Sequence, residues 1–173
     1  MIRAVRPRAL HCAVLVAVGL ASVAAASPLD PPARVRLYAP RAQEQKAGLL
    51  AVTCVSETSG GVADSFQIGW PPVKVRKGSA LKLRIQRADP PSEVRVHGPR
   101  HLLPFTLEAY EPDGVLESWD VRFRAPGPPP RRAIQERNGE RYHVVVLEAT
   151  WEADGECSVY RRGEWGLSLS GTS

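Results

Sequence analysis

Apolar and polar residues alternate with a period of two through most of the chain after its first third. Residues 81–86 read LKLRIQ and residues 119–124 read WDVRFR, so one side chain in two is apolar in each segment. The longest segment of this kind runs from residue 142 to residue 151, and one of its faces is apolar from Val145 to Trp151. Such alternation is typical of an antiparallel strand that packs one face on a core and exposes the other.

Turn-forming residues separate these segments. They read KGS at 77–79, DPP at 89–91, EPDG at 111–114 and DG at 154–155. No window has the apolar period of an amphipathic helix. Eight or so short strands separated by turns predict an all-β sandwich of two antiparallel sheets, which we place at residues 47–173.

The first 26 residues have the three parts of a secretory signal peptide. Three arginines precede an uncharged apolar run from residue 13 to residue 23, and alanines at 24–26 form a small-residue cleavage site. The run is shorter than the roughly 20 residues that a membrane-spanning helix needs. We therefore predict export through a signal peptide cleaved after Ala26. The alternative is an uncleaved signal that anchors the chain in a membrane.

Residues 27–46 contain four prolines among polar residues, which predicts a Pro-bearing spacer. Val35 and Leu37 alternate with arginines there and allow a short edge strand. The chain carries 23 basic and 18 acidic side chains, and removal of the three signal arginines leaves 20 against 18, a net charge of +2. Basic residues are spread over the strands rather than gathered in a stripe, so we expect no nucleic-acid partner.

Two cysteines, Cys54 and Cys157, remain once the signal with Cys12 is removed. Two distant cysteines in an exported chain predict a disulfide. Such a bridge would close a loop of about 100 residues and contribute roughly 4–5 kcal/mol in the chain-entropy model. The alternatives are two free thiols or a pair of metal ligands.

Several segments occur in an order that resembles a known group of proteins. VKVRKGSALKLRI at 73–85 is followed by PPSEVRV at 90–96, by FRAP at 123–126 and by RYHVVVLEATW at 141–151. This order resembles small secreted or lipid-anchored bacterial proteins with an immunoglobulin-like β-sandwich, over about residues 48–165. The resemblance implies an immunoglobulin-like sandwich of about seven to nine strands in the cell envelope. The chain departs from the group in lacking a lipobox, and the resemblance carries over no catalytic or binding residue.

Candidate ligand-binding residues are few. His97 and His101 belong to the segment VHGPRH and could ligate copper or zinc, or lie in solvent as loop histidines. Trp70, before two prolines, and Trp165, near the end of the chain, are candidates for contact with a partner. His143 falls on the apolar face of the longest strand, and we expect a partly buried histidine whose ring nitrogens are hydrogen-bonded.

No catalytic constellation emerges from the sequence, because there is no nucleophile-elbow motif and the cysteines are expected to be paired. We therefore expect a non-catalytic binding or structural module of the cell envelope or extracellular space, without a cofactor. Its partner would be an unknown protein or envelope component, contacted through loops such as residues 125–133. The alternatives are a small exported copper- or zinc-binding protein and an exported hydrolase.

Overall fold

The structure, a computed structural model, describes residues 31–40, 44–64, 68–127, 135–137 and 140–172. These residues form twelve strands and one short 3-10 helix, η1 (Pro112–Gly114). The strands are β1 (Arg34–Tyr38), β2 (Gln45–Lys46), β3 (Gly48–Val55), β4 (Gly60–Asp64), β5 (Ile68–Arg76), β6 (Ala80–Gln86), β7 (Glu93–His97), β8 (Phe105–Tyr110), β9 (Ser118–Arg124), β10 (Gln135–Arg137), β11 (Glu140–Asp154) and β12 (Cys157–Thr172).

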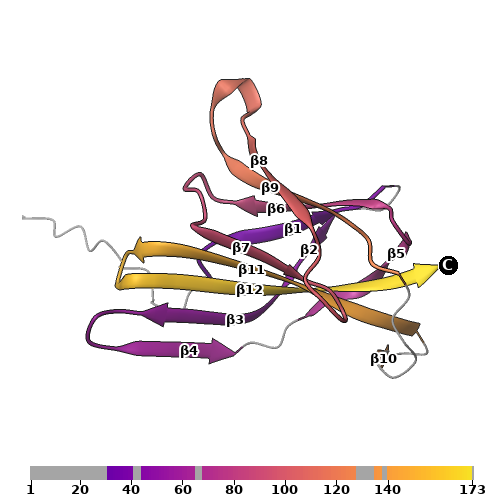
Figure 1. The fold of residues 1–173 in the computed structure, drawn as a ribbon, viewed down its shortest axis with the longest axis horizontal. Coiled ribbons are helices and arrows are strands. Elements are labelled where there is room, and N and C mark those ends of the chain that lie inside the picture. Colours follow the sequence, from indigo (N-terminus) through magenta and orange to yellow (C-terminus); the bar gives the residue numbers. More distant parts are fainter. Residues whose placement is uncertain (1–30, 41–43, 65–67, 128–134, 138–139, 173) are drawn as a thin grey trace, which may run out of the picture.

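The strands form two sheets that pack face to face (Figure 1). The five-stranded sheet has the order β2-β1-β6-β9-β8, and all its pairs are antiparallel. The seven-stranded sheet contains β10-β11-β12-β3-β4, with β7 beside β11 and β5 parallel to the end of β12. The prediction of an all-β sandwich is confirmed.

The core lies between the sheets and follows the alternation in the sequence. Leu83 and Ile85 of β6 and Val121 of β9 are fully buried on one side. Val145, Leu147 and Ala149 of β11 pack against them from the other sheet. The residues that alternate with these core residues along each strand point away from the core, because side chains along a strand point alternately to opposite faces.

Strand order can be compared with that of an immunoglobulin domain, which has the order A-B-E-D in one sheet and C-F-G in the other. The orders β1-β6-β9-β8 and β7-β11-β12 correspond to these two sets. The hairpin of β3 and β4 has no counterpart in them, and the disulfide lies within one sheet instead of joining strands B and F. The immunoglobulin-like character therefore stays a prediction that the strand order supports.

The predicted boundary between spacer and domain at residue 46 differs from the structure. Strand β1 pairs along its whole length with β6, and both Val35 and Leu37 are buried in the core. The short edge strand allowed by the sequence is thus an inner strand of the five-stranded sheet, with β2 outside it. The prolines on either side of this strand predicted a spacer, although Val35 and Leu37 pack in the core.

Two hairpins of the structure form at segments of turn-forming residues. Gly155, with φ of +61°, turns β11 into β12, as its Asp-Gly sequence predicted. The hairpin of β8 and β9 projects from the body of the sandwich, with η1 at its tip (Figure 1). Within the described residues, no helix is long and apolar enough to cross a membrane.

Candidate functional site

The predicted cysteine pair forms a disulfide in the structure. Cys54 of β3 and Cys157 at the start of β12 are bonded, with 5.2 Å between their Cα atoms. Strands β3 and β12 are neighbours in the seven-stranded sheet, so the bond ties the start of β12 to the strand beside it. Neither sulfur is a free nucleophile or metal ligand in this state.

The two candidate metal ligands lie around one tight turn. His97 ends β7, and the amide of Gly98 donates a hydrogen bond to the carbonyl of His101 at 2.9 Å. The imidazole of His97 lies beside a carboxylate, with 3.4 Å between its Nε2 and Glu148 Oε2, whereas His101 is exposed. No group of three or more histidine, cysteine, aspartate or glutamate residues that could hold a metal ion is found in the described part of the chain.

The predicted partner contact at Trp165 is wrong. Its side chain is 2 % exposed and belongs to the core, because the inward face of β12 carries Trp165, Leu167 and Leu169 with a period of two. This period was visible in the sequence and could have located the residue. The side chain of Trp70 and most of the 125–133 loop, from residue 128 onward, lie outside the described residues, so these two predictions stay open.

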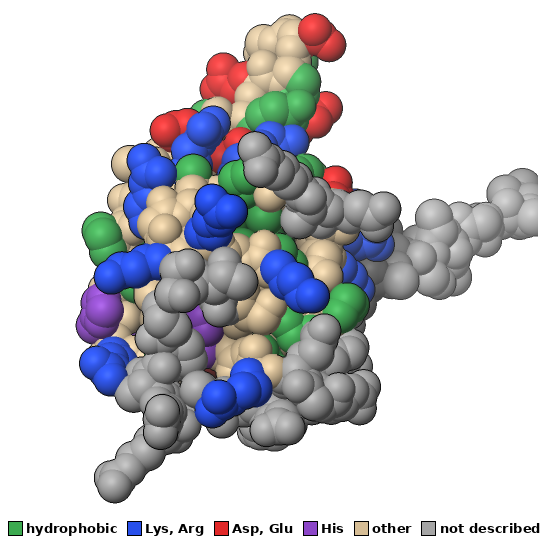
Figure 2. Space-filling view, turned by 90° about the vertical axis from the view of Figure 1, so that its right-hand side faces the viewer, with side chains coloured by type: hydrophobic (Ala, Val, Ile, Leu, Met, Phe, Trp, Pro, Cys, Tyr) green, Lys and Arg blue, Asp and Glu red, His purple; other side chains and the backbone are tan. Residues whose placement is uncertain are grey.

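The outer face of the five-stranded sheet is a basic surface, which we call the basic face. Its outward positions carry seven cations and three acids, a balance of +4. The cations are Arg34, Arg36, Lys46, Lys82, Arg84, Arg122 and Arg124, and the acids are Glu44, Glu108 and Asp120. Seen from one end of the molecule, Lys and Arg side chains are spread over its body and acidic ones gather on the projecting hairpin (Figure 2).

A buried ion pair between Arg84 and Asp120 lies at the centre of this face. Arg84 donates two hydrogen bonds to Asp120, at 2.7 and 3.0 Å, and Lys82 Nζ lies 3.3 Å from the same carboxylate. Burial alone would raise the pKa of Asp120, but the hydrogen bonds and charge of Arg84, together with Lys82, outweigh it and lower the pKa. The Arg84 guanidinium also lies over the ring of Tyr110, 3.3 Å from its centroid.

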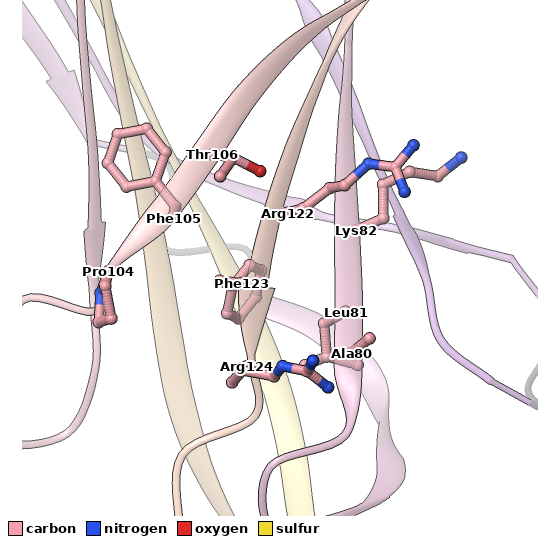
Figure 3. Close-up of a pocket in the computed structure, with 9 residues that line it drawn as sticks. All are labelled: Ala80, Leu81, Lys82, Pro104, Phe105, Thr106, Arg122, Phe123 and Arg124. Carbon is pink, nitrogen blue, oxygen red and sulfur yellow. The ribbon is translucent and has the colours of Figure 1, made fainter.

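Next to this ion pair, the face is hollowed where β6, β9 and β8 run side by side. The hollow has a volume of about 550 Å³ and carries Lys82, Arg122 and Arg124. In Figure 3 these three cations extend to one side of the strands, and the ring of Phe105 points to the other side. We call this hollow, with its three cations, the basic hollow.

Two of the cations of the basic hollow, Arg122 and Arg124, keep capacity for a ligand, whereas Lys82 lies against Asp120. Arg122 pairs with Glu108 at 2.8 Å, but both side chains are more than half exposed, and such exposed pairs are weak. Arg124 donates to the carbonyl of Gly78 at 3.2 Å, which leaves its charge uncompensated by that contact. Guanidinium groups with free donors are well suited to carboxylate, sulfate or phosphate oxygens.

Sequence reasoning missed the basic face, although its signal was present. The residues that alternate with the apolar ones at 81–86 and 119–124 are largely lysine and arginine. Only the pairing of β6 with β9, which sets Lys82 opposite Arg122, gathers these scattered charges on one surface.

The chain matches no protein-family model, no curated protein and no solved structure. The resemblance to small exported bacterial proteins therefore stays a prediction that rests on the segments quoted above.

Proposed function

We propose that this chain is an exported, non-catalytic binding module of the cell envelope or extracellular space, and that it binds an anionic ligand on the basic face. The observation that carries the proposal is the basic hollow, whose lining combines three cations with mostly apolar uncharged residues. The ligand would present carboxylate, sulfate or phosphate groups, because these fit both the charge and the donor geometry of arginine.

Export is supported by the signal-like first 26 residues and by the disulfide. Stable disulfides form in oxidising compartments and are rare in the cytosol. A natural sample of the protein should therefore have the mass of residues 27–173 and gain the mass of about two hydrogens on reduction. Retention of residues 1–26 would instead make the chain membrane-tethered and would contradict cleavage after Ala26.

The basic hollow can be tested with polymers of defined charge. We expect titration calorimetry to show binding to at least one of polygalacturonate, dextran sulfate and polyphosphate, and none to neutral dextran. The affinity should fall as salt is added, because ions screen the contributing charges. Equal behaviour of all four polymers would contradict the proposal.

A pair of double variants separates the hollow from overall charge. Arg122→Gln with Arg124→Gln should weaken binding about tenfold, which corresponds to about 1.4 kcal/mol. Lys74→Gln with Arg76→Gln removes the same charge from exposed positions of β5, outside the basic face, and should have a much smaller effect. Equal losses in the two variants would show non-specific attraction by the whole molecule and overturn the assignment of the hollow.

The metal-binding alternative has a direct test of its own. His97 has a carboxylate neighbour in Glu148, a pair of ligand types that zinc accepts. If copper or zinc raises the melting temperature of the native chain but not that of a His97→Gln variant, the metal-binding alternative replaces the binding-module proposal. Unchanged melting in both would remove that alternative.

A further inference from the structure

A second concave surface lies on the opposite face of the sandwich, outside the seven-stranded sheet. The start of β7, the end of β11 and the start of β12 enclose a groove of about 580 Å³. We call it the polar groove, and Glu93, Thr150, Tyr160 and Arg162 are among its lining residues. In the sheet, Thr150 of β11 stands between Glu93 of β7 and Arg162 of β12.

Buried polar atoms beside this groove have no hydrogen-bond partner in the described structure. Thr150 is 7 % exposed and Glu148, two residues along the same face, is 9 % exposed. Thr150 Oγ1, Glu148 Oε1 and Arg162 Nε are all enclosed and unbonded. Native proteins bond nearly all of their buried polar atoms to protein groups or to ordered water, so these atoms have hydrogen-bonding capacity for a polar ligand or for water.

Arg162 connects these atoms to the groove. Its Nε lies 3.6 Å from Glu148 Oε1, which is within ion-pair range but too long for a hydrogen bond. About a third of its side chain is exposed, and its guanidinium lies 5.3 Å from the centroid of the Tyr160 ring. A ligand that attracts this guanidinium toward the groove would separate it from Glu148 Oε1 and free that oxygen to accept a hydrogen bond.

The charges of the groove indicate which ligand it would take. Three carboxylates, Glu93, Glu148 and Glu152, lie in or beside it and disfavour an anion. Glu93 is paired with Arg95 and Glu148 with Arg162, so little net charge remains to attract a cation. The unbonded set contains an acceptor, a donor and a hydroxyl that can be either, and a ligand hydroxyl satisfies all three kinds.

We propose that the polar groove binds a neutral sugar. Its hydroxyls would donate to Glu148 and accept from Arg162 and Thr150, and the Tyr160 ring and the exposed Val159 side chain would contact its apolar CH surface. This site does not depend on the anionic ligand proposed for the basic face, because the two surfaces lie on opposite sheets.

Binding can be measured with neutral oligosaccharides of defined structure. Cellohexaose, maltohexaose and N-acetylchitohexaose are titrated into the disulfide-bonded chain, with hexagalacturonate as the anionic comparison, while backbone amide shifts are followed by NMR. We expect one neutral hexasaccharide to shift the amides of Thr150, Tyr160 and Arg162 and to leave those of β6 and β9 unchanged. Failure of all three, or shifts by hexagalacturonate alone in this groove, would overturn the proposal.

Thr150→Val distinguishes a ligand site from buried atoms that merely hold water. The change keeps the shape of the side chain and removes the hydroxyl. It should lower the affinity for the sugar about fivefold, the effect of losing one hydrogen bond, while the melting temperature stays equal or rises. The matched variant Thr106→Val alters a hydroxyl on the opposite sheet and should leave the sugar affinity unchanged. Unchanged affinity in Thr150→Val would show that the groove does not bind the sugar through this residue and would overturn the site.

Discussion

Replacement of His143 by leucine is predicted to stabilise the protein, and to do so more strongly as the pH falls. His143 is 2 % exposed on the inward face of β11, paired across the sheet with Leu169 of β12. Neither of its ring nitrogens has a hydrogen-bond partner within the described residues. Burial lowers the pKa of His143, because the charged imidazolium is disfavoured away from water.

The size of the effect at neutral pH follows from the two unbonded nitrogens. An unsatisfied buried polar group costs about 1–3 kcal/mol relative to an apolar group of similar shape. Leucine is close to histidine in size and suits a site lined by a leucine, so little strain should offset this gain. We expect the free energy of unfolding of His143→Leu to exceed that of the wild type by about 1–3 kcal/mol at pH 7.5.

The pH dependence comes from the unfolded chain. Its histidine titrates near pH 6.5, whereas the folded form stays neutral to lower pH because its pKa is lowered. Below about pH 6.5 the unfolded state therefore binds a proton that the folded state does not, and the wild type loses stability as the pH falls. This loss should grow as the pH falls below 6.5, at up to about 1.4 kcal/mol per pH unit, and it should be absent from His143→Leu.

Urea unfolding of both proteins, followed by tryptophan fluorescence with the disulfide intact, gives the difference in stability at each pH. His101→Gln is the control, because His101 is exposed and its replacement should leave the pH profile of the wild type unchanged. The reasoning is refuted if the difference between the wild type and His143→Leu stays constant from pH 7.5 to pH 5, or if it shrinks on acidification.

Three other substitutions test the packing and pairing described above. Asp120→Asn should lower the free energy of unfolding by about 2 kcal/mol, because it removes charge-assisted hydrogen bonds from Arg84. The pKa of Asp120 is lowered in the folded state. In urea unfolding, the difference from the wild type should therefore shrink below about pH 4, where the carboxylate becomes protonated. Conversion of Cys54 and Cys157 to serine should cost about 4–5 kcal/mol by the same assay, because the bond spans 103 positions; a loss below 1 kcal/mol would contradict this. Gly163→Ala should lower the melting temperature, because a Cβ there overlaps the ring of Trp165, and overpacking of this kind costs about 1–3 kcal/mol; an unchanged melting curve would mean that the ring moves freely.

Much of the fold could be predicted from the sequence, because alternation is a local property. The faces of β6, β9 and β11 that pack on the core were identified from period two alone, and so was the inward direction of His143. The expected hydrogen bonds of its ring nitrogens are absent among the described residues, and its burial is deeper than expected. The disulfide followed from having two cysteines in a chain predicted to be exported. The errors came where local signals conflicted, as for β1, which lies among prolines but is tied to the core by its pairing with β6.

The candidate sites were much less predictable. His97 was considered as half of a loop pair with His101, but the structure pairs it with Glu148, 51 positions along the chain. Thr150 and Arg162 carry no motif, and they become neighbours only because β11 pairs with β12. Such partners are set by non-local strand pairing, which no short sequence window contains.

The sequence by itself determined which side of each strand faces the core, where the chain turns, and that the outward positions of β6 and β9 are rich in cations. Tertiary structure alone decided that β9 lies beside β6, so that Arg84 meets Asp120 and three cations line one hollow. It also decided that the polar groove forms where β7, β11 and β12 meet. The physical reason is that side-chain direction depends on the local backbone, whereas strand neighbours are selected by the burial and hydrogen bonding of the whole sheet.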